Sequence, residues 1–247
     1  KSKQLLRYAV GIAATLLFAL VSIHVYQHIT QPEMEYIATS FGEKKTIVLP
    51  DGSEVVLNSM SALTYQKKMR NKTREVELTG EAFFKVKKDK SRPFTVRTSV
   101  ADVNVLGTKF NVDAYENQSQ VITTLFEGSV AVDFRDGNVM HLSPGEQAVW
   151  EKNSRMADKR KPDNIGNERA WQQNMLIFNN TPLLDILKTL EREHDVQFVS
   201  DDAVLNSLRM TARFSSLESV DAALTLLGES ADFAFYREGK RYTITSK

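Results

Sequence analysis

The sequence predicts three structured segments: a single N-terminal transmembrane helix, an all-β domain, and a small α+β domain of duplicated β-α-β units. Three observations support this prediction. Residues 8–30 contain no Asp, Glu, Lys or Arg, residues 41–150 alternate apolar and polar positions between turn residues, and the stretch from residue 175 onward carries two apolar helical stripes. The expected boundaries are a cytoplasmic stub over 1–7, the helix over 8–30, the all-β domain over 31–150, a linker over 151–172 and the α+β domain over 173–247.

The N-terminal apolar stretch is long enough to cross a bilayer. Its central run is AVGIAATLLFALVSIHV, and a helix from Tyr8 to Tyr26, rising about 1.5 Å per residue, covers the roughly 30 Å of a hydrocarbon core. Both tyrosines stand where interfacial aromatic residues are expected. A cleaved signal peptide is the alternative, but its apolar region is typically about 7 to 15 residues long, and no small-x-small cleavage site follows here. The sequence therefore favours an anchor.

The charges on the two sides of this anchor differ. Lys1, Lys3 and Arg7 precede it, whereas the following stretch up to residue 41 offers the acidic Glu33 and Glu35 before any basic residue. Because basic residues are enriched in cytoplasmic flanks, we expect the N-terminus in the cytoplasm and everything after residue 30 outside.

Between residues 41 and 150 the sequence predicts many short strands. Alternating apolar positions are clearest at Phe110, Val112 and Ala114 and at Val130, Val132 and Phe134. Turn residues recur at 50–53, 79–81, 127–129, 136–138 and 143–146. None of these turns is a phosphate loop, because no Gly-rich stretch leads into a helix carrying Lys-Ser/Thr. The pattern is typical of a sandwich, a barrel or a β-solenoid, and we expect a solenoid-like or sandwich-like form.

Composition excludes several classes of function. The formal net charge is +1, and after the first three basic residues 29 basic residues face 31 acidic ones, so charge gives no case for direct nucleic-acid binding. The chain has no cysteine, which excludes disulfides, thiolate metal sites and a cysteine nucleophile. We expect no cofactor.

The histidines do not predict a metal or catalytic site. His24 and His28 stand four residues apart on the anchor, but two histidines alone form an incomplete metal site. His141 and His194 lie far apart in the sequence, without ligand spacing around either, and no G-x-S-x-G motif predicts a serine nucleophile. We therefore expect no metal and no catalytic residue from this set.

A cluster of carboxylates gives a weak indication of an enzyme. Glu75, Glu77 and Glu81 lie near a predicted turn and would suit a glycosidase. However, alternate positions on a strand are also those of solvated surface residues. The surface interpretation is favoured.

The C-terminal part predicts a strand, a helix and a strand, twice. Residues 151–172 are polar and basic and are interpreted as a linker. A strand over 175–178 then precedes Thr181 and Pro182, a predicted N-cap and first helical residue. Leu183, Ile186, Leu187 and Leu190 form an apolar stripe, and a strand around 196–199 follows.

The same pattern recurs thirty-seven residues later, where Leu183 aligns with Val220 and Leu190 with Leu227. Ser219 is predicted to cap this second helix and Gly228 to end it. A final strand over 241–244 follows the turn at 238–240 and completes a small α+β domain.

Five motifs together resemble the FecR domain. They are LPDGSEVVLNSMSALTY (49–65), VELTGEAFFKV (76–86), RPFTV (92–96), VLGTKFNVDAY (105–115) and LSPGEQA (142–148), in this order. The C-terminal part is similar to the small C-terminal domain of Bacteroidetes-type FecR proteins and to the short signalling domains of secretins and TonB-dependent receptors. Its leucine stripes are less specific, because such stripes are usually core positions.

The resemblance implies an inner-membrane anti-sigma factor or sigma regulator. Its expected partners are the periplasmic signalling domain of a TonB-dependent receptor, a sigma factor held by a cytoplasmic domain that this sequence lacks before residue 1, and an intramembrane protease. Contact with the receptor could use strand addition at an open sheet edge. The binding surface is not predicted.

The resemblance also directs attention to one peptide bond. In some FecR-like regulators the Gly-Thr step of the VLGT motif cleaves itself, which here corresponds to Gly107 and Thr108. A threonine hydroxyl can attack the preceding carbonyl where the backbone is strained. No base is identifiable, and the alternative is a tight bend between two strands.

Two other functional classes remain open. A tethered periplasmic scaffold, or a module that binds envelope polymers, would use a similar signalling-domain-like fold. An anchored carbohydrate-active enzyme is the weaker option.

Overall fold

The computed structural model describes residues 2–30, 32–69, 73–135, 137–200, 207–231 and 233–246. In the N-terminal helix, the side chains of residues 2, 3, 5, 6, 8, 9 and 26–30 lie outside the description. The earlier predictions on Lys1, Lys3, Tyr8, Tyr26, His28 and Asp136 therefore fall outside the described residues or side chains. The chain divides into two compact units, Lys1–Met34 and Glu35–Lys247.

The first unit is helix α1 (Ser2–Thr30), so the helical conformation predicted for residues 8–30 is confirmed. The side chains from Val10 to Val25 are all exposed, among them Leu17 and Phe18. Among the residues that the structure describes, no helix has both the length and the apolar character needed to cross a membrane.

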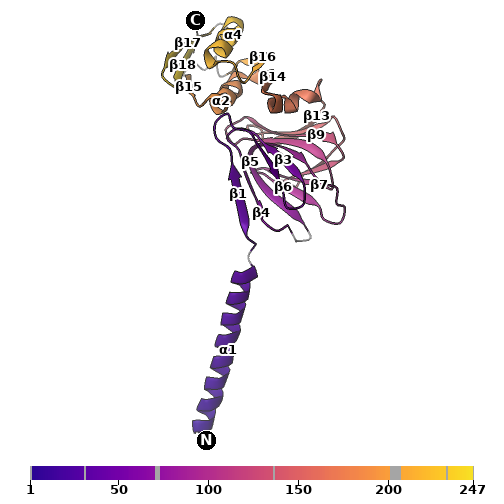
Figure 1. The fold of residues 1–247 in the computed structure, drawn as a ribbon, viewed down its shortest axis with the longest axis vertical. Helices are drawn as coiled ribbons and strands as arrows, with labels where there is room; N and C mark the ends of the chain where they lie inside the picture. The colour runs from indigo at the N-terminus through magenta and orange to yellow at the C-terminus, as the bar shows by residue number, and fades with distance from the viewer. Residues whose placement is uncertain are drawn as a thin grey trace. The chain divides into compact units, whose positions relative to one another are not determined.

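The second unit begins with an all-β domain, as predicted. Its strands are β1 (Met34–Ala38), β2 (Lys45–Val48), β3 (Glu54–Leu57), β4 (Ala62–Gln66), β5 (Arg74–Lys85), β6 (Phe94–Arg97), β7 (Ala101–Val105), β8 (Lys109–Ala114), β9 (Gln120–Glu127), β10 (Val130–Phe134), β11 (Val139–Leu142), β12 (Gln147–Glu151) and β13 (Met156–Arg160). The main path of the sheet runs β11-β10-β7-β6-β5-β8-β9-β12-β13. Figure 1 labels several of these strands, among them β5, β6, β7 and β9.

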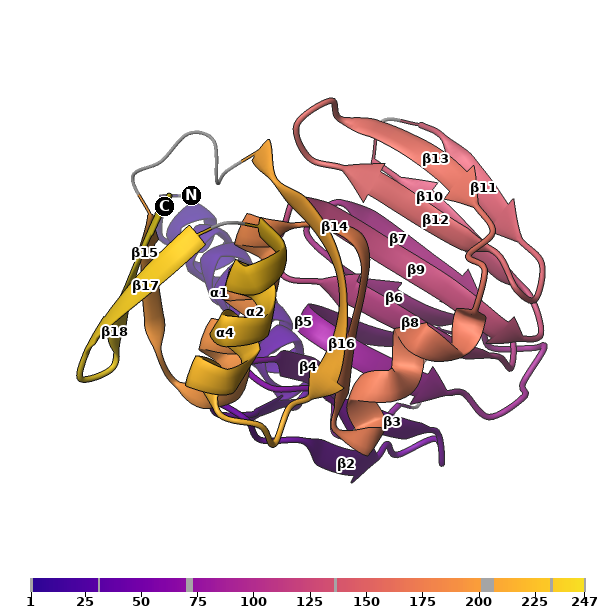
Figure 2. The ribbon, with the colours of Figure 1, turned by 90° about the horizontal axis from the view of Figure 1, so that it is seen from above.

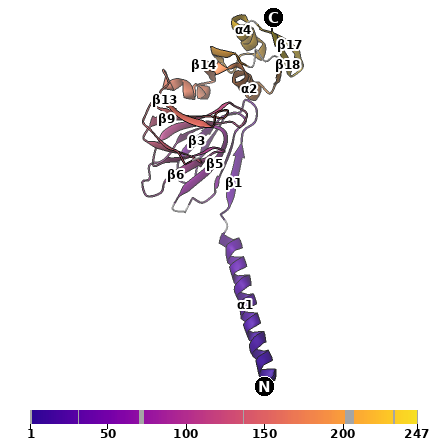
Figure 3. The same ribbon diagram turned by 180° about the vertical axis from the view of Figure 1, so that it is seen from behind.

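Strand β5 joins the two halves of this sheet. Its first part, from Arg74, pairs with β6 and β4, and its second part, from Gly80 to Lys85, pairs with β8 and β3. Gly80 has φ +91°, and a Cβ there would lie 2.3 Å from Ser61 Oγ, so only glycine fits. The strands consequently form one nearly closed, barrel-like sheet, seen from behind in Figure 3.

This topology corrects the expected solenoid-like or sandwich-like form. From β2 to β13, paired strands run antiparallel except β5 with β6, whereas a β-solenoid stacks parallel strands. A sandwich has two separate sheets, but here β5 belongs to both halves. The alternation in the sequence predicts which face is buried but not how the strands are connected.

Aromatic side chains fill the interior. Phe84 stacks on Phe110 with ring centroids 5.0 Å apart and meets Phe94 edge to face, while Phe134 stacks on Trp150 at 5.3 Å. Such aromatic pairs contribute about 0.5–1.5 kcal/mol each beyond the area they bury. Because strands from both halves supply these rings, the sheet closes around a single core.

One ion pair is buried in this domain. Arg74 Nη1 donates to Asp51 Oδ2 at 2.8 Å, and both side chains are 1% exposed. Nη1 also donates to the carbonyl of Lys87, and Nε donates to the carbonyl of Arg92. The guanidinium thereby ties the turn before β3 to the loop after β5.

The predicted linker over 151–172 is largely regular structure. Strand β13 pairs with β12 from Gln147 to Glu151, and the 3-10 helix η1 (Ile165–Gln173) begins at Asn164, whose side chain accepts from Gly166 N. The sequence carries no apolar signal here because β13 is an edge strand with nearly every side chain exposed. Main-chain pairing with β12 holds it, together with ion pairs from Lys159 to Glu146 and from Arg160 to Glu151.

The C-terminal domain contains β14 (Met175–Pro182), α2 (Leu183–His194), β15 (Gln197–Ser200), β16 (Arg209–Ser215), α4 (Val220–Ala231), β17 (Phe233–Glu238) and β18 (Arg241–Ser246). Strands β14 and β16 form an antiparallel pair, and β15, β18 and β17 form a second sheet in that order. Helices α2 and α4 lie between the two sheets (Figure 2). All four stripe residues of α2 are buried, as predicted.

Two predicted helix boundaries are wrong. Thr181 does not cap α2, because β14 continues through Pro182, which itself occupies the N-cap position without a side-chain bond. Gly228 does not end α4. It lies inside the helix, where a Cβ would come within 2.9 Å of the carbonyl oxygen of Phe233. The predicted cap at Ser219 is confirmed, since its Oγ accepts from Ala222 N at 3.2 Å.

Candidate functional site

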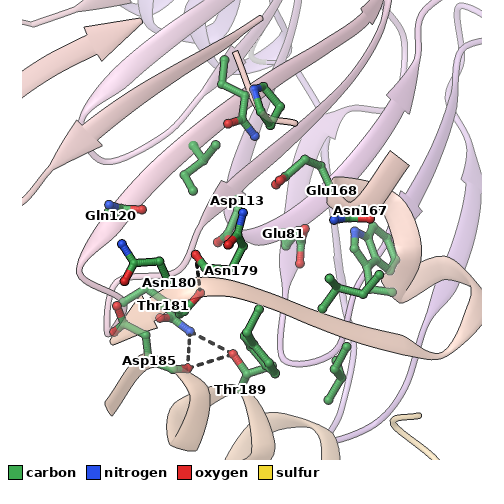
Figure 4. Close-up of a pocket in the computed structure, with 18 of the residues that line it drawn as sticks. Glu81, Asp113, Gln120, Asn167, Glu168, Asn179, Asn180, Thr181, Asp185 and Thr189 are labelled. Carbon is green, nitrogen blue, oxygen red and sulfur yellow. Dashed lines mark hydrogen bonds between the residues drawn. The ribbon is translucent and has the colours of Figure 1, made fainter. Parts of the chain in front are cut away.

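The all-β domain and the C-terminal domain meet around a cavity of about 510 Å³, which we call the interdomain cavity. Strands β5, β8 and β9, helix η1 and helix α2 all contribute to its wall. Figure 4 shows Glu81, Asp113, Glu168 and Asp185 around it. The cavity is therefore lined by carboxyl groups from both domains.

Glu81 lies in the wall of this cavity on strand β5 and is buried. Its two carboxyl oxygens accept hydrogen bonds from Asn58 Nδ2 and Asn111 Nδ2, each at 2.8 Å. Burial first, and then the nearby charge of Asp113, raise the pKa of Glu81 to about 8, against the lowering effect of the two amides and Arg192. The side chain is therefore protonated at neutral pH.

Asp113 is the direct cross-strand partner of Glu81 in the β5–β8 pair. Burial raises the pKa of Asp113, while the guanidinium of Arg192 is the strongest influence in the opposite direction. Glu168 of η1 behaves similarly: burial raises its pKa to about 7, although Gln147 donates a hydrogen bond to it. The cavity thus concentrates carboxyl groups that resist ionisation.

The C-terminal end of α2 contacts the all-β domain through Arg192. Its guanidinium carbon lies 3.7 Å from the ring centroid of Tyr115, a cation–π contact. Nη2 donates to Thr189 Oγ1, and the main-chain carbonyl of Arg192 accepts from Gly42 N at 2.9 Å.

The neighbouring residue on α2 adds two polar contacts. Glu193 accepts from Ser59 Oγ at 2.6 Å and from Lys44 Nζ at 3.3 Å. Its side chain is 4% exposed, so this end of the helix is well covered by the all-β domain.

The N-terminal end of α2 is held by Asp185. Its carboxylate accepts from Ser119 through both the hydroxyl and the main-chain N–H, and Gln118 Nε2 donates to the carbonyl of Asp185 and to Thr189 Oγ1 at 3.2 Å. Helix α2 is therefore fastened to the all-β domain at both ends, and polar atoms make these contacts. We call the two sets of contacts together the α2 clasp.

The α2 clasp joins the two domains mainly through polar contacts. Across the described residues, no group of three or more His, Cys, Asp or Glu side chains could hold a metal ion. A polar contact between two domains resembles transient protein interfaces, which open and close more readily than apolar ones. The polar contacts of the α2 clasp are therefore of a kind that can form and break reversibly.

The predicted cleavage residues lie elsewhere and do not line the interdomain cavity. Gly107 has φ +152°, and a Cβ there would come within 2.5 Å of Lys88 Cα, so glycine is required. Thr108 is buried, and its Oγ1 donates to the carbonyl of Ser129 at 3.0 Å. The hydroxyl of Thr108 thus donates to a main-chain carbonyl rather than to a carboxylate or an imidazole that could act as a base.

The three glutamates of the predicted cluster do not converge on one site. Glu75 pairs with Arg97 at 3.0 Å near the surface, and Glu77 is exposed, as a solvated strand position predicts. Glu81 alone is buried in the cavity wall. Its role was missed because a polar residue on the outer side of a strand gives no sign that another domain covers it.

Both domains match known families. The family described as FecR protein matches residues 35–145, and the family described as FecR, C-terminal, matches residues 175–244. A search of the curated proteins found no match.

Solved structures agree with this assignment. Two crystal structures of a candidate anti-sigma factor from Parabacteroides distasonis, at 2.50 and 1.65 Å resolution, superpose with TM-scores of 0.82 and 0.81. They are 32% and 33% identical to this chain, cover 87% and 86% of it, and are themselves covered over 100% and 99% of their length. The resemblance found in the motifs is thus confirmed: the chain belongs to the FecR family and is a regulator of the anti-sigma type.

Proposed function

We propose that this chain is the signal-receiving part of an inner-membrane sigma regulator. In this proposal the C-terminal domain binds a partner in the periplasm, and the change is relayed through the all-β domain and across the membrane to an extracytoplasmic-function sigma factor. The observation that carries the proposal is the α2 clasp, in which Asp185 and Arg192 hold the receiving domain by polar contacts that a partner can exchange.

The membrane topology is part of the proposal. Helix α1 carries an unbroken run of exposed side chains from Val10 to Val25, and Arg7 lies directly before this run, whereas the next basic residue after it is Lys44. We propose a single pass with the N-terminus in the cytoplasm, residues 35–247 in the periplasm, and an intramembrane protease acting on the anchor. Membrane association is general in the FecR family.

The proposed partner is the periplasmic signalling domain of a TonB-dependent outer-membrane transporter, bound by strand addition. Among the described strands, β17 pairs with β18 alone, so its other edge is open to an incoming strand. Tyr236 on β17 is 67% exposed and would pack beside that strand. Main-chain hydrogen bonds would supply affinity, and alternate side chains such as Tyr236 would supply specificity.

A pull-down from detergent-solubilised envelopes of the native bacterium tests this partner. The tagged chain is expected to recover a TonB-dependent transporter, and Tyr236→Asp should reduce the recovery at least about tenfold, since a buried interface anchor is worth about 2 kcal/mol or more. Leu226→Asp is the matched control, because Leu226 is an exposed apolar residue on α4 rather than on the edge strand. Recovery of only a secretin or cell-wall polymer would instead favour a tethered scaffold.

We also propose that the bond between Gly107 and Thr108 cleaves itself. The Thr108 hydroxyl would attack the Gly107 carbonyl, giving an ester and a free α-amine, and water would then hydrolyse the ester to a new carboxyl terminus. The support is the glycine-only backbone at Gly107, followed directly by the Thr108 hydroxyl, which can close a five-membered ring onto the Gly107 carbonyl carbon. Mass spectrometry of the purified chain should show two fragments that are absent in Thr108→Ala, and a parent chain that stays intact for days would contradict the proposal.

A further inference from the structure

We propose that the α2 clasp is proton-linked: the C-terminal domain docks on the all-β domain when Glu81 and Asp113 carry protons, and its hold weakens when they ionise. The proposal concerns the two domains of this chain and does not depend on the partner proposed above. It starts from the register of the sheet, in which Glu81 on β5 stands directly opposite Asp113 on β8.

Two ionised carboxylates directly across an antiparallel pair repel each other, and exclusion of water increases that repulsion. When α2 is docked, Glu81 is buried and Asp113 faces the interdomain cavity. The charge that offsets this repulsion most is Arg192, which α2 itself brings. One cation facing two carboxylates leaves an excess of negative charge.

Other charged and titratable groups around this pair come from every element packed against it. They are Arg192 and Asp185 of α2, Glu168 of η1, Lys152 after β12, and Tyr115 and Glu116 after β8, with Lys188, Lys44 and Glu193 at the rim. Lys152 is partly engaged elsewhere, because its Nζ donates to the carbonyls of Tyr115 and Glu116. These neighbours do not restore neutrality around Glu81 and Asp113 when both are ionised.

The surroundings of Glu81 also suit a neutral carboxyl group. Asn58 Oδ1 and Asn111 Oδ1 are both buried without a hydrogen-bond partner among the described residues. They belong to the two amides that already contact Glu81. A protonated carboxyl group has a hydrogen to donate, and rotation of either amide would present an oxygen to accept it. An ionised carboxylate has no such hydrogen.

The direction of the pH effect follows from linkage. Undocking exposes both carboxyl groups to water and returns their pKa values toward the ordinary 4 to 4.5, so the docked form binds more protons. Docking is therefore strongest below about pH 4.5 and weakens as pH rises toward about 8, the pKa of docked Glu81. The docked-to-undocked ratio falls by up to about tenfold per pH unit for each titrating group.

Spin labels can measure this directly, because the chain has no cysteine to compete with introduced ones. Cysteines at Val48, on β2, and Glu238, on β17, place one label on each domain at exposed positions. The full chain should give one narrow distance distribution at about pH 5 and a broader one at about pH 8.5. A distribution that stays unchanged over this range would overturn the proposal.

Neutral substitutions identify the titrating groups. Glu81→Gln combined with Asp113→Asn should keep the narrow distribution up to the higher pH, whereas Glu77→Gln should behave as the parent because Glu77 is exposed on the same strand. If the distance distribution of the double variant broadens with pH as it does in the parent, the pH effect belongs to other groups and the proposal is contradicted. If the double variant does not fold, infrared spectroscopy of the parent at neutral pH still decides, since the proposal requires a protonated carboxyl band that Glu81→Gln removes.

Discussion

The guanidinium carbon of Arg192 lies 3.7 Å from the ring centroid of Tyr115 while the same residue's main-chain carbonyl accepts a hydrogen bond from Gly42. One residue of α2 thus contacts two separate loops of the all-β domain, and its positive charge is also the strongest influence that lowers the pKa of Asp113. The docking of the C-terminal domain should therefore be unusually sensitive to this position.

Replacing Arg192 by Met should weaken docking, because the cation–π contact is lost and the carboxyl groups of the cavity lose their main counter-charge. Hydrogen exchange at the Gly42 amide should accelerate by about tenfold or more, which corresponds to about 1.4 kcal/mol of local stability. Arg237→Met is the control, since Arg237 also makes a cation–π contact, with Tyr242, but within the C-terminal domain and outside the α2 clasp. Equal protection of Gly42 in the parent and in Arg192→Met would show that this residue does not fasten the helix.

The buried ion pair between Arg74 and Asp51 should be essential to the all-β domain. Arg74→Met leaves Asp51 buried without its cation and should cost about 3–5 kcal/mol of unfolding free energy. Arg97→Met removes an exposed pair with Glu75 and should cost no more than about 1 kcal/mol. Urea unfolding of both variants gives the comparison, and similar losses for the two would argue against a special role for burial.

Substitutions at Gly80 and Gly145 distinguish the stability cost of a steric clash from the stability cost of backbone strain. Their φ angles are nearly the same, +91° and +92°, but a Cβ at Gly80 meets Ser61 whereas one at Gly145 meets nothing within 4 Å. Gly145→Ala should cost about 1–2 kcal/mol from strain, and Gly80→Ala should cost about 1–3 kcal/mol more from overpacking. Thermal unfolding measures both, and an equal cost would mean that β5 and Ser61 can separate without penalty.

Substitutions of the two residues predicted to cap helices should have different effects on stability. Ser219→Ala removes the acceptor for Ala222 N and should cost about 1 kcal/mol. Thr181→Ala should have a smaller effect, because Thr181 lies in β14 and its hydroxyl contacts the carbonyl of Asn179 instead. A larger loss for Thr181→Ala than for Ser219→Ala would indicate that the sequence-based assignment of the first cap was right.

Local pattern predicted many, but not all, elements of this fold. Val130, Val132 and Phe134 alternate along one strand and are all buried, and the stripe from Leu183 to Leu190 packs into the C-terminal core. These predictions succeeded because the periods of strands and helices are properties of neighbouring residues. Strand β13 was missed because it is an edge strand, held by main-chain pairing rather than by an apolar face.

The candidate site could not be predicted in the same way. Glu81 and Asp113 are far apart in the sequence, and only the register of β5 with β8 makes them neighbours. The helix that covers them contributes Arg192, which lies further still along the chain. In the sequence of a single strand, an acidic residue that becomes buried cannot be distinguished from one that stays solvated. The difference becomes visible only in the structure, where the second domain covers the strand.

The position of β18 in its sheet sets the order in which the C-terminal domain can assemble. The strand is the middle one of its sheet, because β15 and β17 both pair with it and not with each other. During synthesis on the ribosome, β1 to β13 are complete long before β18 emerges, so the all-β domain can fold while its neighbour still lacks a central strand. A nascent chain therefore passes through a stage in which the barrel-like sheet is formed and Glu81 and Asp113 are still open to water.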